Sequence, residues 1–226
     1  MSTPNVASPA GAFTKARLIE AAERLFAERG IDAVSLREIN RTSGARNAIA
    51  VQYHFADRVG VVRAIMDKHQ PGIEARRHAM LDQYEADGRG DRDRDIRVLS
   101  GALVRPLAAK LSDLDGGPEF LQINADLLNR PNPLVTPSPY DDTNTSVHRW
   151  RMLLEPVIEK DAVRLHRRFT ALAYAASELA RRARSGPHSD DRLFTSYVID
   201  VVAAILGAPV SDETRRLARE RGRLQP

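Results

Sequence analysis

The chain has 226 residues, of which 42% are hydrophobic and 28% are charged, and this composition excludes the low hydrophobicity of a disordered protein. It contains no cysteine, which excludes disulfide bonds, thiolate zinc sites and a cysteine nucleophile. The 34 basic and 30 acidic residues leave a net charge of only +4, so overall charge alone does not indicate a polyanionic partner.

The length allows one large domain or a small domain fused to a larger one, and we expect two modules. Residues 1–12 have no Lys or Arg and no apolar run of signal-peptide length. No later stretch approaches the roughly 18 apolar residues of a membrane span. We therefore expect a cytoplasmic protein with no membrane partner.

The N-terminal region begins with residues 1–13, which are rich in Pro, Ser, Ala and Gly and predict a disordered arm. From residue 14 onward, hydrophobic residues recur at intervals of three and four, which predicts an amphipathic helix ending at Gly30. Its apolar face comprises Leu18, Ile19, Ala22, Leu25 and Phe26.

A second helix has complete local start signals. Ser35 is its expected N-cap, Glu38 closes a capping box, and Val34 packs against Ile39. Gly44 ends this helix after about two turns. A third short helix is expected to begin at Asn47, which can cap it, and to run to about residue 53, with Val51 and Phe55 facing a small core.

The rest of the chain also predicts helices. Asp57 caps a longer helix that ends near Pro71, and Pro106 predicts a kink in a later one. Val201 and Val202 leave a strand as an alternative for the last segment, but fourteen residues at helical spacing favour a helix. The expected helical segments after residue 71 are 71–85, 96–111, 120–128, 147–158, 161–184 and 193–206, with a charged linker at 87–95 and a long loop at 129–146.

A helix, a turn containing Gly44 and a third short helix match the helix-turn-helix plan, in which the second helix of the pair enters the major groove of DNA. Residues 35–63 hold five arginines against only Glu38 and Asp57. A local basic surface of this kind is what phosphate contacts require. The alternative is a solvated face of mixed charge.

Three motifs occur together: Thr-Lys-Ala-Arg-Leu-Ile-Glu-Ala-Ala-Glu-Arg-Leu-Phe-Ala-Glu-Arg-Gly at 14–30, Ser-Leu-Arg-Glu-Ile at 35–39 and Tyr-His-Phe at 53–55. Over about residues 14–70 they resemble the DNA-binding domain of the TetR family. The third helix departs from the family's Gly-Thr-Leu-Tyr type and is one residue longer up to Phe55. It resembles a subgroup with Asn-rich and Gln-Tyr-His-Phe helices. Asn40 stands where the family typically has Ala.

The resemblance implies an all-α protein with a three-helix helix-turn-helix DNA-binding domain at 14–70 and a helical effector-binding and dimerisation domain at 71–226. Asn47 and Gln52 suit adenine edges, Ala48 suits a thymine methyl, and Arg46 suits guanine or a phosphate. The remaining expected DNA contacts, all to phosphates, are Ser35, Arg37, Tyr53, His54 and Arg58. Ser35 is also a cap, and Tyr53 has packing as its alternative role.

One short recognition helix reads only a few base pairs, so a homodimer on a palindromic operator in double-stranded DNA is expected. The alternative is that the two C-terminal apolar stripes pack only within one chain. The expected dimer residues are Phe169, Leu172, Ala173, Ala176, Leu179, Ala180, Ala183, Phe194, Tyr197, Val198, Val201, Val202 and Ile205. The candidate effector-pocket residues, for which ordinary core is the alternative, are Leu103, Leu107, Phe120, Ile123, Leu127, Trp150, Leu154 and Phe169.

We expect no enzymatic activity, no cofactor and no metal, because no His, Asp or Glu near His54 has ligand spacing and no phosphate-cradling glycine loop occurs. The function implied by the resemblance is a transcriptional repressor that an unknown small-molecule effector releases from DNA. The alternatives are a transcriptional activator of the same family, a helical enzyme or small-molecule carrier, and a helical interaction protein without operator binding.

Overall fold

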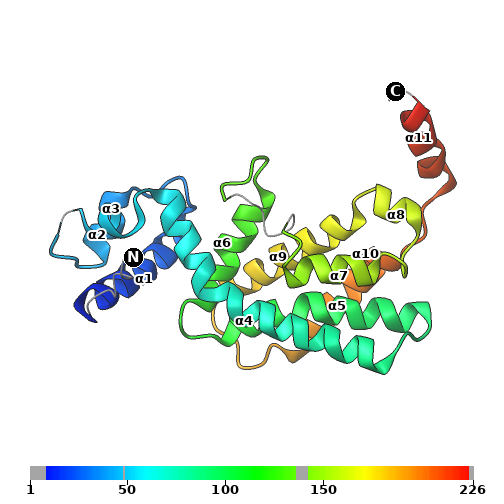
Figure 1. Cartoon of the computed structure of the whole chain (residues 1–226), viewed down its shortest axis with the longest axis horizontal. Helices are drawn as coiled ribbons and strands as arrows, with labels where there is room; N and C mark the ends of the chain where they lie inside the picture. Colours follow the sequence, from blue (N-terminus) through cyan, green and yellow to red (C-terminus); the bar gives the residue numbers. More distant parts are fainter. Residues whose placement is uncertain (1–8, 48, 136–141, 224–226) are drawn as a thin grey trace, which may run out of the picture. The chain divides into compact units, whose positions relative to one another are not determined.

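The computed structural model describes residues 9–47, 49–135 and 142–223, and all regular secondary structure within these ranges is helical (Figure 1). The expected all-α class is confirmed. The chain forms two compact units. Unit 1 combines Met1–Gly72 with Ala109–Ser138 and Leu179–Pro187, and unit 2 combines Ile73–Ala108, Pro139–Glu178 and His188–Pro226.

Unit 1 contains the expected helix-turn-helix segment. Its helices are α1 (Pro9–Arg29), α2 (Leu36–Thr42), α3 (Ala50–Phe55), the first part of α4 (Arg58–Asp87), the short 3-10 helix η1 (Ala109–Ser112), α6 (Gly117–Asn129) and the end of α9 (Arg167–Arg184). Helix α1 packs against α2 and α6, and α2 packs against α3. The apolar face predicted for the first helix supplies much of the core, because Leu18, Ala22 and Phe26 are buried.

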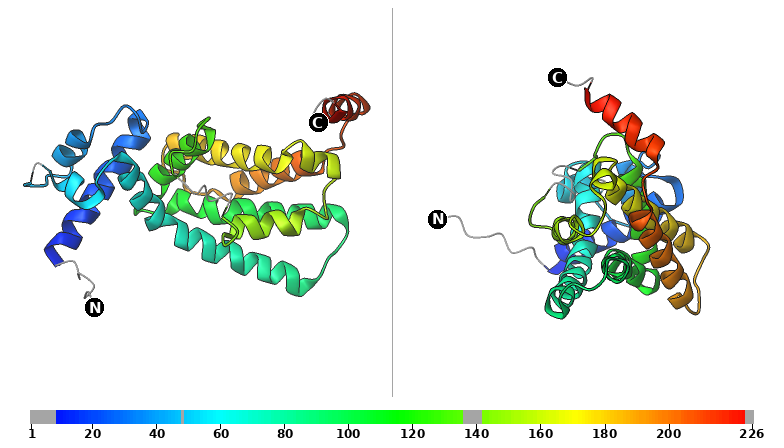
Figure 2. Two further views of the ribbon diagram at one scale, coloured as in Figure 1. Left: turned by 45° about the horizontal axis from the view of Figure 1, so that its top comes forward. Right: turned by 90° about the vertical axis from the view of Figure 1, so that its right-hand side faces the viewer.

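Unit 2 contains the remaining helices. They are α5 (Arg92–Ala108), α7 (Ser146–Leu154), α8 (Lys160–Arg164), α10 (Arg192–Gly207), α11 (Asp212–Arg223) and the parts of α4 and α9 outside unit 1. Helix α5 packs against both α7 and α10 (Figures 1 and 2). Trp150 of α7 is buried, and its indole Nε1 donates a hydrogen bond of 2.8 Å to the carbonyl oxygen of Leu99.

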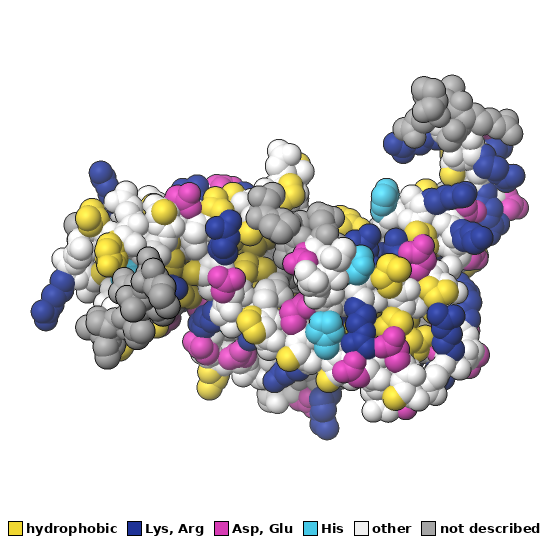
Figure 3. All heavy atoms as spheres, in the orientation of Figure 1, with side chains coloured by type: hydrophobic (Ala, Val, Ile, Leu, Met, Phe, Trp, Pro, Cys, Tyr) yellow, Lys and Arg dark blue, Asp and Glu magenta, His cyan; other side chains and the backbone are white. Residues whose placement is uncertain are grey.

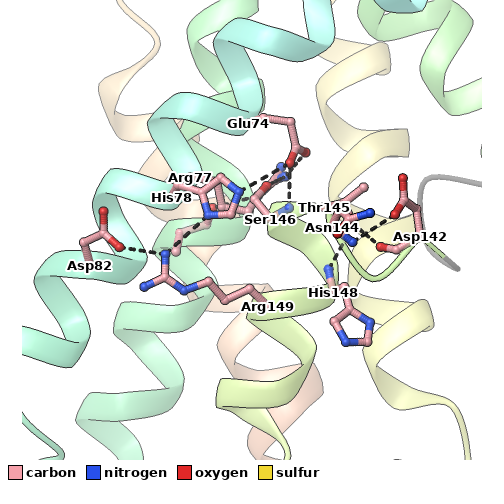
Figure 4. A network of polar contacts seen from close by, with 11 residues as sticks. Glu74, Arg77, His78, Asp82, Asp142, Asn144, Thr145, Ser146, His148 and Arg149 are labelled. Carbon is pink, nitrogen blue, oxygen red and sulfur yellow. Dashed lines mark hydrogen bonds and ion pairs between the residues drawn. The ribbon is translucent and has the colours of Figure 1, made fainter.

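A polar network holds the N-terminus of α7 against α4 (Figure 4). Arg77 is only 2% exposed; its Nε donates to the carbonyl of Ala102 and its Nη1 donates to Ser146 Oγ at 2.8 Å. The amide of Ser146 donates to Glu74 Oε2 at 2.5 Å. Because a buried guanidinium is costly unless it is hydrogen-bonded, this network ties three segments of unit 2 together.

The start of α1 and the end of α4 differ from the prediction. Helix α1 begins at Pro9, so residues 9–13 are helical where an arm was expected, and residues 1–8 lie outside the described residues. Helix α4 runs through Pro71 to Asp87. A proline inside a helix loses one backbone hydrogen bond, but His69 and Ile73 on either side are buried and hold the helix in place.

The expected helix at 161–184 is divided into α8 and α9. His166 has a φ of 55°, in the left-handed region that a non-glycine side chain rarely adopts, and the chain turns there. The structure also has a helix, α11, that was not predicted from the sequence. Helix α10 confirms the helical interpretation of the segment containing Val201 and Val202.

Within the described ranges, no single helix is long and apolar enough to cross a membrane; α10 and the first part of α11 meet those criteria only as a pair, with a bend of 60° between them.

Candidate nucleic-acid interface

The start of α2 has the predicted capping box. Ser35 Oγ accepts from the amide of Glu38 at 3.2 Å, and the Glu38 carboxylate accepts from the amide of Ser35 at 2.9 Å. Hydrogen bonds lower the pKa of Glu38 to about 2; the bond from the backbone amide of Ser35 has the largest effect, and those from Arg29 and the Ser35 hydroxyl come next. The Ser35 hydroxyl also donates to Glu38 at 2.8 Å. The Ser35 hydroxyl is therefore hydrogen-bonded within the cap, although Ser35 is exposed to solvent.

Asn40 explains how α2 positions the turn before α3. It is 7% exposed, its Nδ2 donates to the carbonyl of Asn47 at 2.8 Å, and its Oδ1 accepts from the amide of Val51 at 3.3 Å. One side-chain amide thus satisfies two backbone groups that an Ala would leave without these bonds. The sequence departure at this position is therefore a structural contact, which its polar type inside an apolar face could have indicated.

Helix α3 has one buried edge and one exposed edge. Ala50, Val51 and Phe55 are 2–7% exposed and face the core of unit 1, as predicted for the latter two. Gln52 is exposed, and Tyr53 is 78% exposed. His54 is half-buried, with its ring 5.1 Å from that of Tyr53 in an edge-on arrangement. The polar edge of this helix is therefore directed to solvent within unit 1.

The helix begins three residues later than predicted. Asn47 lies before α3, and its Oδ1 accepts from the amide of Ile49 at 3.0 Å, which forms a turn rather than a helix cap. Asn47 is exposed. Ala48, the candidate thymine contact, lies outside the described residues.

The arginines divide into two groups. Arg37 and Arg46 are exposed, and neither forms an ion pair within the described part of the chain. Arg58 instead donates to the carbonyl of Val34 at 3.0 Å and lies 3.7 Å from Asp32, so it also braces unit 1. The Lys and Arg side chains that Figure 3 shows near α2 and α3 project at the edge of the surface, and the face between them carries mainly hydrophobic and other side chains. A cavity of about 440 Å³ lies beside the turn between α2 and α3, and its lining includes Arg17 and Arg46.

The expected dimer residues are divided between core and surface. Six of them, Leu172, Ala176, Leu179, Ala180, Val198 and Val202, are buried within the chain. Phe169 and Tyr197 are 51% and 56% exposed. The half-buried residues are Ala173, Ala183, Phe194, Val201 and Ile205. The surface of α10 therefore retains an apolar stripe at helical spacing.

Most expected effector-pocket residues are core residues. The buried ones are Leu103 and Leu107 of α5, Phe120 and Ile123 of α6, and Trp150 and Leu154 of α7. Leu127 is half-buried and Phe169 is exposed.

Comparison with known protein families gives a match for the segment that contains α2 and α3. Residues 18–65, which span most of α1, all of α2 and α3 and the start of α4, match the family model described as bacterial regulatory proteins, tetR family. No curated protein matches the sequence of this chain. The described residues thus define an all-helical protein whose N-terminal segment is a helix-turn-helix domain of the kind found in these bacterial regulators.

Three solved structures are similar to this chain. The fatty acid degradation regulator FadR from Bacillus halodurans is 12% identical, with a TM-score of 0.46 over 86% of this chain and 98% of that one. A gamma-butyrolactone receptor (ArpA-like protein) is 20% identical, with a TM-score of 0.46 over 85% and 98%. A TetR-family regulator from Streptomyces coelicolor A3 is 19% identical, with a TM-score of 0.39 over 89% and 99%.

Proposed function

We propose that this protein is a sequence-specific, DNA-binding transcriptional regulator that acts as a homodimer. We further propose that it is a repressor which a small-molecule effector releases from a palindromic operator. The observation that carries the proposal is the exposed polar edge of α3, with Gln52 and Tyr53 directed to solvent while Val51 and Phe55 are buried. The match of residues 18–65 to a family of regulatory proteins supports the same function.

The base and phosphate contacts assigned above predict different effects of two substitutions. Arg46→Ala removes a phosphate-neutralising charge, so we expect weaker binding to all DNA and a salt slope lower by about 1. Gln52→Ala removes a base contact, so we expect a loss of about 1–3 kcal/mol on the operator with an unchanged salt slope. The measurement is the affinity for DNA flanking the protein's own gene across a range of salt concentrations.

Arg164→Ala is the matched control for this experiment, because Arg164 belongs to unit 2 and its side chain is 75% exposed. We expect it to bind operator DNA like the wild type. If Arg46→Ala and Gln52→Ala both bind like this control, the proposed DNA-binding surface is wrong. A promoter fusion with and without the gene distinguishes a repressor from an activator.

The homodimer is assigned to the apolar stripe of α10, where Tyr197 is 56% exposed and Val201 and Ile205 are half-buried. A charge at the centre of an apolar interface would be desolvated without a partner. We therefore expect Val201→Arg to be a monomer in sedimentation equilibrium at concentrations where the wild type is a dimer. Leu217→Arg, which makes a similar change on α11 at a residue that is 50% exposed, is expected to remain a dimer. A dimeric Val201→Arg variant would contradict this interface.

A further inference from the structure

A buried polar cluster in unit 1 connects α1 to α4 and η1. Glu23 of α1 and His69 of α4 are each 1% exposed, and His69 Nε2 lies 2.8 Å from Glu23 Oε1. On the other side of the ring, Lys110 Nζ of η1 lies 3.0 Å from His69 Nδ1. Charged groups are rarely buried without close partners, so these contacts hold the three helices together.

The contacts determine where the imidazole of His69 carries its proton. An ammonium group has only donors, so His69 Nδ1 must accept from Lys110 and carries no hydrogen. The single ring hydrogen is then on Nε2 and is donated to Glu23. His69 is therefore neutral in this arrangement. A second proton, on Nδ1, would face the ammonium of Lys110 and would break that hydrogen bond.

Other charged groups complete the cluster. Lys68 Nζ lies 2.9 Å from Glu23 Oε2 and 2.8 Å from Asp115, and Lys110 lies 2.7 Å from Asp113. Burial opposes the charge of Lys68, but its bonds to Asp115 and Glu23 outweigh burial and raise its pKa above the ordinary value. The hydrogen bond from Lys110, followed by one from the amide of Asp115, lowers the pKa of Asp113.

Among the described residues, the charged groups linked to His69 through these contacts are Glu23 on α1, Lys68 on α4, Lys110 on η1, and Asp113 and Asp115 in the turn before α6. Lys68 and Lys110 each have a carboxylate partner, so each ammonium group keeps a hydrogen-bond acceptor when His69 changes its protonation state.

The backbone fits closely around the same cluster. Gly116, at the start of α6, has a φ of 78°, and a Cβ added there would lie 2.3 Å from Glu23 Oε2. The ring of Phe120 on α6 lies 4.6 Å from that of His69 between centroids, at an interplanar angle of 31°. A displacement of η1 or of the start of α6 must therefore disturb Glu23 and, through α1, the packing of α2.

We propose that His69 is a positioning residue for the DNA-binding helices, and that protonation of its Nδ1 makes operator binding weaker as the pH falls. This inference rests on the proposed DNA-binding function. The neutral ring links α1 to η1 and keeps the helix-turn-helix in one arrangement. Once protonated, the ring no longer accepts from Lys110, the helices adopt more arrangements, and the apparent affinity falls with the fraction that remains competent.

The test compares the wild type with His69→Gln between pH 8 and pH 6 at constant ionic strength. A glutamine amide donates and accepts like the neutral ring but does not titrate in this range. We expect equal operator affinities at pH 8 and an affinity about fivefold lower for the wild type than for His69→Gln at pH 6, the effect of losing one charge-assisted hydrogen bond. Because His54 and all other titratable groups are common to both proteins, their effects cancel in this ratio.

Two further measurements separate positioning from a merely structural role. Lys110→Met removes the donor at every pH, so we expect its affinity to be about fivefold below the wild type at pH 8 and its ratio to His69→Gln to stay constant with pH. Nitrogen-15 NMR of the wild type at pH 8 is expected to show the Nε2–H tautomer of His69, a readout that needs no DNA.

A constant ratio of wild-type to His69→Gln affinity across the pH range would overturn the inference, even if both proteins bind operator DNA tightly. An Nδ1–H tautomer of His69 at pH 8 would also overturn it. Failure of every variant to bind specific DNA at any pH would instead refute the proposed function, and the pH dependence with it. The three outcomes are therefore distinguishable.

Discussion

Arg77→Met is expected to lower the free energy of unfolding by about 3 kcal/mol, because it removes a buried cation and leaves its partners without their donor. The partners are the carbonyl of Ala102, the hydroxyl of Ser146 and the carboxylate of Glu74, which Arg77 contacts at 3.2, 2.8 and 3.5 Å. Methionine keeps much of the apolar part of the arginine side chain, so the decrease in the free energy of unfolding measures the polar contacts. Urea unfolding measures the effect.

The neighbouring Arg76 provides the control, since it is exposed on the same helix. We expect Arg76→Met to change the free energy of unfolding by less than about 0.5 kcal/mol. Equal effects of the two substitutions would mean that the network in Figure 4 contributes nothing to stability. A double substitution with Ser146→Ala should be less destabilising than the sum of the two single ones, because both remove the same hydrogen bond.

Asn40→Ala is expected to reduce both stability and DNA binding. It leaves the carbonyl of Asn47 and the amide of Val51 without their side-chain partner, at a cost of about 2 kcal/mol in unfolding free energy. Because these bonds hold the turn that precedes α3, we expect operator affinity to fall by at least about tenfold even where the protein remains folded. Thermal unfolding and DNA binding at a temperature below both transitions measure the two effects.

Thr42→Ala is the matched substitution on the exposed side of α2. It should leave both stability and operator affinity close to those of the wild type. The role assigned to Asn40 would be refuted by an Asn40→Ala variant that is destabilised but binds operator DNA with wild-type affinity when folded, since the side chain would then stabilise unit 1 without positioning α3.

The helix-turn-helix segment was predictable because its signals are local. The capping box needs only Ser35 and Glu38, three residues apart, and both of its hydrogen bonds are present. Gly30 ends α1 with a φ of 83°, and Asp57 Oδ1 accepts from the amide of Gly60 at the start of α4, both in agreement with the prediction. Such signals act within one helical turn, so the surrounding fold does not change them.

Other features were not predictable, because distant contacts outweigh the local preference. Pro71 predicts a helix end, but the buried residues on either side carry α4 past it. No glycine or proline near His166 indicates the break between α8 and α9 in the sequence. The division of the two C-terminal stripes between core and surface also depends on which helices cover them.

The sequence alone determined the helical class, the helix-turn-helix and the side chains that present a polar edge, since hydrophobic periodicity and helix caps depend on residues within a few positions of one another. Only the tertiary structure brought Glu23, His69 and Lys110 together, because these residues lie 46 and 41 positions apart along the chain. Spacing in sequence carries no information about such pairs, whereas packing of α1, α4 and η1 around one buried ring determines them.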